Sequence, residues 1–238
     1  MNDATVLTPV QGGERIDALD VLRGFALLGI LLMNIEGMVG PLNGALTGID
    51  PALTGADRWA DAFIYFFVQG KFYPLFSLLF GMGFAVMMQR AAEAGRPFVR
   101  IYLRRVLALL AIGLAHALLV WSGDILTTYA LVALLLLLFF RDTPQSRLPK
   151  WGIAFMLLPI ALVLTFGLLV DLAGLTAEGA KQMADMERQG DAAMTAQHEA
   201  QRQAQGSGSY AQALAQRWSD FRMMMGYLVF WAGQLLGL

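Results

Sequence analysis

The sequence predicts an all-α protein, a polytopic membrane helix bundle with about six apolar segments, one further interfacial or re-entrant helix and a cytoplasmic N-terminus. Of its 238 residues, 57% are hydrophobic and 15% are charged, whereas soluble domains average about 45–50% and about 25%. Several apolar runs approach the roughly 20 residues that a helix needs to span a membrane. Short basic loops between these runs indicate their orientation by the positive-inside rule.

The composition also excludes several classes of function. A net charge of −1 provides no basic field for nucleic acid, so we expect no such partner. With no cysteine, the chain has no thiolate nucleophile, and its two histidines are too few for a multi-histidine metal site. We therefore expect no metal. The first apolar run follows no signal-peptide pattern, so we expect it to remain as a membrane anchor.

The first span is predicted near 21–36, after a cytoplasmic segment of residues 1–19. Asp20, Arg23 and Asn34 fall within a narrow arc of one helix face, because a helix turns by about 100° per residue. Charge within a membrane is costly unless it faces protein or water, so this stripe is expected to face into a bundle. A structural alternative stays open, in which Asp20 caps the helix, Arg23 reaches the headgroups and Asn34 bonds a neighbouring helix.

The next apolar stretch is too long for one span and is predicted to form two helices. Residues 37–55, which contain several glycines and two prolines, are expected to form an external loop. Residues 57–68 combine tryptophan, tyrosine and several phenylalanines, a pattern typical of an interfacial or re-entrant helix. The second span is expected over 71–89, beginning at Lys71 and with Pro74 in its first turn.

Basic loops separate the remaining spans of the bundle, which is expected to cover residues 20–170. Five arginines lie between residues 90 and 105, and two arginines and a lysine lie between residues 141 and 150. The positive-inside rule places both loops in the cytoplasm. The further spans are predicted near 106–121, 124–140 and 151–170.

The last part of the chain is polar before it becomes apolar again. Residues 171–220 are rich in alanine, glutamine and methionine and are expected to form an external helical excursion, broken by a Gly-Ser-Gly-Ser sequence at 206–209. His198 lies there among glutamine and glutamate residues, and we expect it to be solvated. Residues 221–238 begin a further apolar segment that is shorter than a full span, as expected of a truncated chain.

His116 lies inside a predicted span, and Asp124 follows just beyond the next turn. An ionisable group in a membrane is a candidate for function, and imidazole exchanges a proton near neutral pH. If the hairpin folds back, Asp124 orients the ring, which makes the two residues a candidate general base and its orienter. In the structural alternative, His116 bonds a neighbouring helix and Asp124 caps the next span. Glu36 and Lys71 are expected at the same external level.

Three stretches of sequence resemble a family of bacterial membrane proteins. They are LDVLRGFALLGILLMNI from Leu19, KFYPLFSLLFGMGF from Lys71 and GLAHALLVWSGDILTTYALVALL from Gly113. In this order and spacing they resemble the YeiB family, and the run from His116 to Leu126 is the most specific piece. The resemblance implies a multi-pass protein of the bacterial inner membrane, longer than this chain, with a C-terminal domain of unknown function.

The D-x-x-R-G sequence from Asp20 to Gly24 is more loosely similar to heparan-alpha-glucosaminide N-acetyltransferase and other transmembrane acyltransferases. That similarity implies transfer of an acyl group from a cytosolic acyl-CoA to a small-molecule or glycan acceptor across the membrane. It implies that Arg15, Asp20 and Arg23 receive the anionic donor. The histidine of those enzymes precedes the second span. Here that region has none, so His116 takes the role of base.

Two other classes of function stay open. In a transporter, the stripe that includes Asn34 lines a pathway, and Glu36 and Lys71 bind a substrate or a coupling ion. In a structural membrane component, the same residues affect stability alone. The lipid bilayer is the expected partner in every case, and association into a homo-oligomer is open in each.

Overall fold

The computed structural model describes residues 17–40, 48–49 and 53–236, with side chains described as far as residue 226. All regular secondary structure in these residues is helical, which confirms the predicted all-α class. The chain divides into two compact units. Unit 1 comprises Met1–Val39 and Gly44–Phe98, and unit 2 comprises Gly40–Asn43 and Val99–Leu238.

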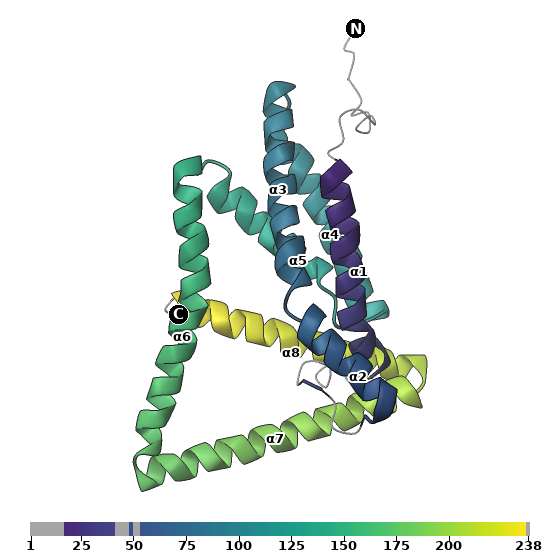
Figure 1. Ribbon diagram of the computed structural model, residues 1–238, viewed down its shortest axis with the longest axis vertical. Coiled ribbons are helices and arrows are strands. Elements are labelled where there is room, and N and C mark those ends of the chain that lie inside the picture. The colour runs from purple at the N-terminus through teal and green to yellow at the C-terminus, as the bar shows by residue number, and fades with distance from the viewer. Residues whose placement is uncertain (1–16, 41–47, 50–52, 237–238) are drawn as a thin grey trace. The chain divides into compact units, whose positions relative to one another are not determined.

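Unit 1 is built on the packing of two long helices, α1 (Asp17–Val39) and α3 (Phe72–Glu93), which lie side by side (Figure 1). Gly29 of α1 lies directly against the ring of Phe72, which occupies the place where a side chain at Gly29 would begin. Ala26, nearly one turn earlier, is fully buried. Small residues on α1 thus let the two helices approach each other closely.

A shorter helical segment precedes α3. Helix α2 (Gly55–Phe63) passes directly into one turn of π-helix, η3 (Ile64–Val68). The chain then turns into α3 at Gly70, whose φ of 74° is a conformation that glycine adopts without strain. Trp59 and Phe66 are largely exposed, as the aromatic residues of an interfacial helix would be. The position of this segment in a membrane stays a prediction.

Unit 2 begins with two helices joined by a turn. They are α4 (Phe98–Leu119) and α5 (Leu126–Leu135), and α5 continues as a π-helical turn, η4 (Leu136–Phe140). Helix α4 begins earlier than the span predicted from residue 106, because the arginines of the basic loop are good helix formers and extend it. A 3₁₀ turn, η5 (Gln145–Arg147), then leads into α6 (Leu148–Gly174).

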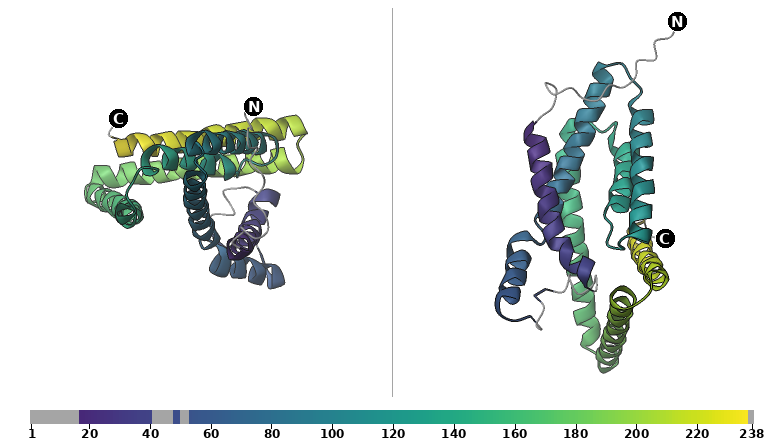
Figure 2. Two further views of the ribbon diagram at one scale, coloured as in Figure 1. Left: turned by 90° about the horizontal axis from the view of Figure 1, so that it is seen from above. Right: turned by 90° about the vertical axis from the view of Figure 1, so that its right-hand side faces the viewer.

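The polar excursion forms a helical hairpin of α7 (Ala177–Gly206) and α8 (Tyr210–Leu236), which run antiparallel (Figure 2). Helix α7 is capped by Thr176, whose hydroxyl oxygen accepts a backbone N–H of the first turn at 3.0 Å. Helix α8 begins with a capping box. The side-chain oxygen of Gln212 accepts the N–H of Ser209 at 2.7 Å, and the N–H of Gln212 donates to the Ser209 hydroxyl at 3.4 Å.

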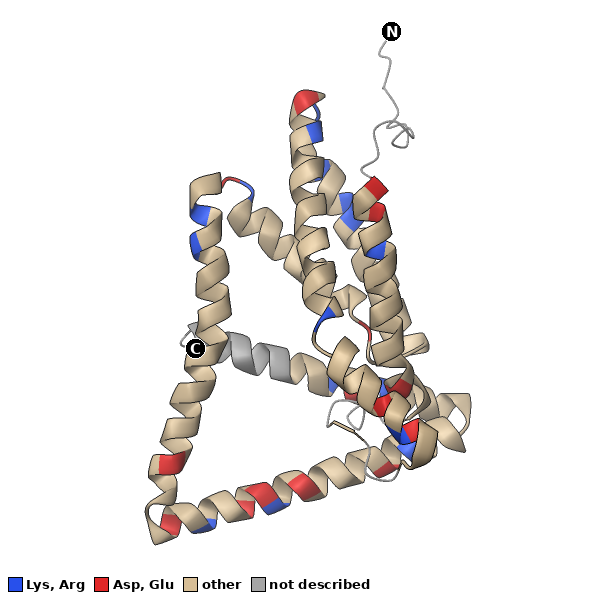
Figure 3. Ribbon diagram, viewed as in Figure 1, with Lys and Arg blue, Asp and Glu red and all other residues tan. Residues whose placement is uncertain are grey.

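Among the residues that the structure describes, three helical stretches are long and apolar enough to cross a membrane, namely Asp17–Val39, Gly55–Glu93 and Gln145–Gly174. The third has no buried residue in its membrane-length window, and α6 carries charge only towards its ends (Figure 3). An exposed apolar surface of this length suits lipid and not water. The chain is therefore a membrane protein. A further apolar helix, Leu126–Phe140, is shorter, and the six spans and the cytoplasmic N-terminus stay predictions.

Candidate functional site

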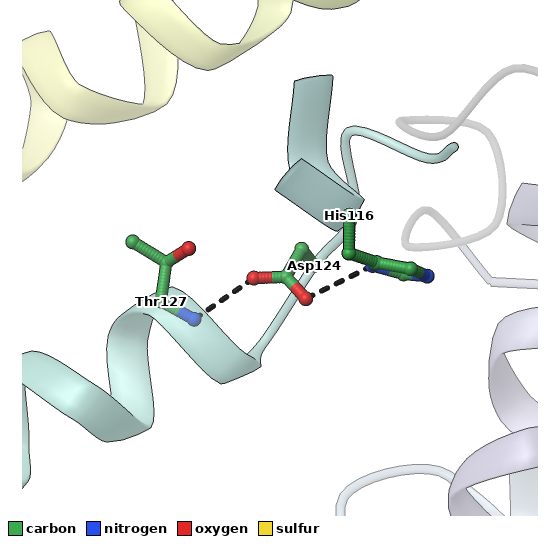
Figure 4. A network of polar contacts seen from close by, with 3 residues as sticks. All are labelled: His116, Asp124 and Thr127. Atoms are coloured by element: carbon green, nitrogen blue, oxygen red, sulfur yellow. Dashed lines mark hydrogen bonds and ion pairs between the residues drawn. The ribbon is translucent and has the colours of Figure 1, made fainter. Parts of the chain in front are cut away.

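His116 and Asp124 are in contact in unit 2, and we call them the dyad (Figure 4). His116 lies in the last turn of α4, and Asp124 lies in the segment 120–125 that leads to α5. His116 Nδ1 is 3.0 Å from Asp124 Oδ1. Asp124 Oδ2 accepts the backbone N–H of Thr127 at 2.8 Å, a donor that the start of a helix leaves without an intrahelical partner. One carboxylate thus orients the imidazole and caps α5.

The two members of the dyad differ in exposure. The Asp124 side chain is 1% exposed, and its two hydrogen bonds offset part of the cost of burying a charge. The His116 side chain is 33% exposed, and its Nε2 points away from the carboxylate (Figure 4). Within the described part of the chain, Nε2 makes no hydrogen bond. An ionised carboxylate only accepts, so in that state of Asp124 the proton is on Nδ1, and Nε2 of a neutral ring is then a proton acceptor.

Two glycines set the path of the chain around the dyad. A Cβ on Gly113, nearly one turn before the histidine, would lie 2.6 Å from the backbone nitrogen of Thr127. The start of α5 therefore lies against α4 only because this position has no side chain. Gly123, next to Asp124, is covered by the ring of Trp121, which would collide with any side chain there. The turn is thus shaped by close packing as well as by hydrogen bonds.

The residues predicted at the cytoplasmic mouth belong to unit 1. Arg23 Nη1 lies 3.1 Å from Asp20 Oδ1, and both side chains are partly exposed. Arg15 lies outside the described residues. Asn34, on the same predicted stripe, accepts a hydrogen bond of 2.6 Å from the hydroxyl of Tyr73 on α3. The structure therefore gives Asn34 the interhelical bond that the sequence left as one alternative, and a binding role for these residues stays a prediction.

Glu36 and Lys71 also belong to unit 1. Glu36 lines a cavity of about 10 Å³, the space of roughly one water molecule, together with residues that include Asp61 and Gln69. The ammonium of Lys71 donates to the carbonyl oxygens of Phe66 at 2.5 Å and Gln69 at 3.4 Å, which closes the turn after η3. Lys71 thus has a structural use, and substrate binding by either residue stays a prediction.

Sequence reasoning missed Asp220 on α8, which is 5% exposed and hydrogen-bonded to residues of α7, α8 and the α4–α5 turn. A signal was present, because Gln197 and Gln201, like Gln216 and Asp220, are spaced four residues apart and share a helix face. The burial of His198 also differs from the prediction that this residue is solvated. It is half-buried in the packed hairpin, and its Nε2 is enclosed with no hydrogen-bond partner among the described residues.

Comparison with known proteins identifies relatives of the chain. It is 43% identical over 158 residues to the uncharacterized protein YxaH of Bacillus subtilis (strain 168). It is 39% identical over 163 residues to the uncharacterized protein YeiB of Escherichia coli (strain K12). YeiB and YxaH are homologues of this chain. The predicted resemblance of the chain to YeiB-type proteins is thus confirmed.

The alignment with YxaH covers 64% of this chain and 39% of YxaH, and the alignment with YeiB covers 66% and 40%. The chain therefore spans about two fifths of the length of the curated relatives it matches. No family model matches the chain, and no solved structure matches it significantly. Because YeiB and YxaH are uncharacterized, their names assign no activity, and the acyltransferase similarity stays a prediction.

Proposed function

We propose that this protein is a multi-pass acyltransferase of the bacterial inner membrane in which the dyad supplies the general base and its orienter. The observation that carries the proposal is the 3.0 Å contact between His116 Nδ1 and the buried carboxylate of Asp124, which leaves Nε2 unbonded within the described chain. A general base needs a lone pair within reach of a substrate proton and a partner that stabilises the imidazolium. The dyad offers both.

In the proposed reaction, an acyl group passes from an acyl-CoA to a hydroxyl group of a small-molecule or glycan acceptor. Nε2 of His116 takes the hydroxyl proton while the acceptor oxygen attacks the thioester carbonyl carbon. A carbon–oxygen bond forms, the carbon–sulfur bond breaks and the thiolate of CoA leaves. The proton then passes from Nε2 to the thiolate, which returns the ring to its neutral form. Asp124 stays ionised throughout and stabilises the imidazolium.

The phosphates of the donor are proposed to bind near the start of α1. The side chains of Arg23 and Asp20 are 39% and 51% exposed, and exposed ion pairs contribute about 0–1 kcal/mol. Arg23 is therefore released from its partner at little cost. A guanidinium group binds phosphate oxygens in a bidentate manner, which suits an anionic donor. Arg15 is proposed to add a second cation there.

The proposal is tested on the protein in proteoliposomes, with acetyl-CoA as donor and glucosamine or glycerol as acceptor. Release of the CoA thiol is followed with a thiol reagent, to which the chain adds no background because it has no cysteine. We expect His116→Ala to lower the rate by at least about 100-fold, the usual contribution of general base catalysis. Asp124→Asn should also slow the reaction, because an amide does not stabilise the imidazolium in the same way.

His198→Ala is the matched control, because it removes the other histidine of the chain and should leave the rate unchanged. Thiol release that is undiminished in the His116→Ala protein would refute the assigned base. Uptake of the acceptor into the liposomes without thiol release would favour a transporter instead.

A further inference from the structure

Asp220 of α8 is a buried carboxylate that is surrounded by neutral hydrogen-bond donors. Its Oδ1 accepts from the side-chain amides of Gln216 at 2.9 Å, Gln201 at 3.0 Å and Gln197 at 3.4 Å. Its Oδ2 accepts from the hydroxyl of Ser122 at 3.2 Å. Gln201 is 1% exposed, so the centre of this network is closed to water. Asp220 therefore joins α7, α8 and the α4–α5 turn at one side chain.

The bond to Ser122 reaches the turn that carries half of the dyad. Ser122 and Asp124 are two residues apart in the segment 120–125, and both are buried. The turn is thus held on one side by the bond from Ser122 to Asp220 and on the other by the contact of Asp124 with His116. A displacement of Ser122 is transmitted over two peptide units to the carboxylate that orients the imidazole.

Helix α8 also holds the end of α4. The hydroxyl of Tyr210 and Nη1 of Arg217 both donate to the backbone carbonyl oxygen of Leu119, at 3.0 Å and 3.1 Å. This carbonyl is one of the last four of α4, which have no intrahelical partner, and a cation is favourable at that end of a helix. Helix α8 thus contacts the chain just after His116 and again just before Asp124.

We propose that Asp220 is a positioning residue for the dyad. Through Ser122 it fixes the α4–α5 turn and thereby the separation of Asp124 and His116. Asp220 contributes through Ser122 and has no contact with the reacting atoms. Only the catalytic consequence rests on the proposed acyl transfer, because the geometry of the dyad is measurable without a substrate.

Two variants that each remove one hydrogen bond from Asp220 separate positioning from general stability. Ser122→Ala removes the bond that reaches the turn, whereas Gln216→Ala removes a bond within α8 and leaves the turn untouched. Gln216→Ala is therefore the matched control. Asp220→Asn is a second test variant of nearly unchanged size, which retains an acceptor oxygen and loses the charge.

The readout is the Nδ1 proton of His116, observed by NMR on the ¹⁵N-histidine-labelled protein in detergent micelles. The His198→Ala background leaves a single histidine, so the signal is assigned directly. A proton shared with a carboxylate resonates downfield. We expect Ser122→Ala and Asp220→Asn to lose or shift this signal and Gln216→Ala to keep it. Thermal unfolding of each variant reports any general loss of stability.

In the acyl-transfer assay, Ser122→Ala should lower kcat by about tenfold to hundredfold with KM unchanged, as expected when catalytic groups are misplaced. A wild-type Nδ1 signal in both Ser122→Ala and Asp220→Asn, or an equal loss in Gln216→Ala, would overturn the positioning role. If the signal changes as expected but the wild type releases no thiol, positioning stands and the proposed acyl transfer fails. If the wild type transfers acyl groups and neither Ser122→Ala nor Asp220→Asn changes kcat or the signal, acyl transfer stands and the positioning role fails.

Discussion

Replacing Gly113 by alanine tests whether the close approach of α5 to α4 sets the geometry of the dyad. The added Cβ would lie 2.6 Å from the backbone nitrogen of Thr127 and 2.8 Å from its Oγ1. Ordinary contacts of this kind are about 3.5 Å or longer, so the start of α5 has to move by about 1 Å. Asp124 is bonded to the same nitrogen and moves with it. Its 3.0 Å contact with His116 then lengthens beyond hydrogen-bond range.

We expect Gly113→Ala to lower the free energy of unfolding by about 1–3 kcal/mol, the range for an overpacked core. The gain of about 1 kcal/mol that alanine brings to a helix in place of glycine offsets only part of a larger overpacking cost. Gly167 of α6 is the matched control, because nothing lies within 4 Å of its Cβ position, and Gly167→Ala should be neutral or stabilising. Thermal unfolding in detergent measures both. Equal stability of the two variants, with an unchanged His116 Nδ1 signal, would show that the close approach of α5 to Gly113 does not determine the geometry of the dyad.

Two further substitutions test contacts outside the dyad. Tyr73→Phe deletes the hydroxyl that bonds Asn34 and should cost about 1 kcal/mol in thermal unfolding; an unchanged midpoint would contradict the interhelical role of Asn34. Thr176→Ala removes the N-cap of α7 and should also cost about 1 kcal/mol. Faster hydrogen exchange in the first turn of α7 checks this, and Thr176→Ser, which keeps a hydroxyl, should restore slow exchange.

The helical class and the membrane setting follow from composition and apolar run length, because both properties depend on local sequence. The break between α2 and α3 was also predictable, since Gly70 interrupts the apolar run with a polar residue on each side. The start of α4 at Phe98 was not predictable from hydropathy. Hydropathy marks only the apolar part of a helix, whereas α4 begins before that part, in the segment that contains the arginines. The π-helical turn η3 has no hydropathy signal at all, because its apolar residues also suit an α-helix.

The contact within the dyad was predictable because its two residues are close in sequence. The Asp220 network was not predictable because it joins residues that are far apart in sequence. His116 and Asp124 are eight positions apart, so the reversal of the chain between α4 and α5 is enough to bring them together. Ser122 and Asp220 are 98 positions apart. Helical periodicity shows which residues share a face but does not identify the partner of that face. The glutamine-rich sequence around Gln201 has the composition of a solvated helix, and only packing of α7 on α8 buries it.

Asp124 and Asp220 are buried carboxylates. Asp124 accepts a bond from the start of α5 and Asp220 accepts one from the α4–α5 turn, and within the described chain neither is paired with lysine or arginine. A buried carboxylate without a cation costs more than a neutral amide of the same size, so stability alone would favour asparagine at both positions. We propose that such a charge has a use in the reaction. In the proposed acyl transfer, an ionised Asp124 stabilises an imidazolium on His116. At Asp220 the carboxylate accepts the bond from Ser122 at 3.2 Å, and in the proposed positioning role this bond holds the turn in place while the dyad exchanges a proton.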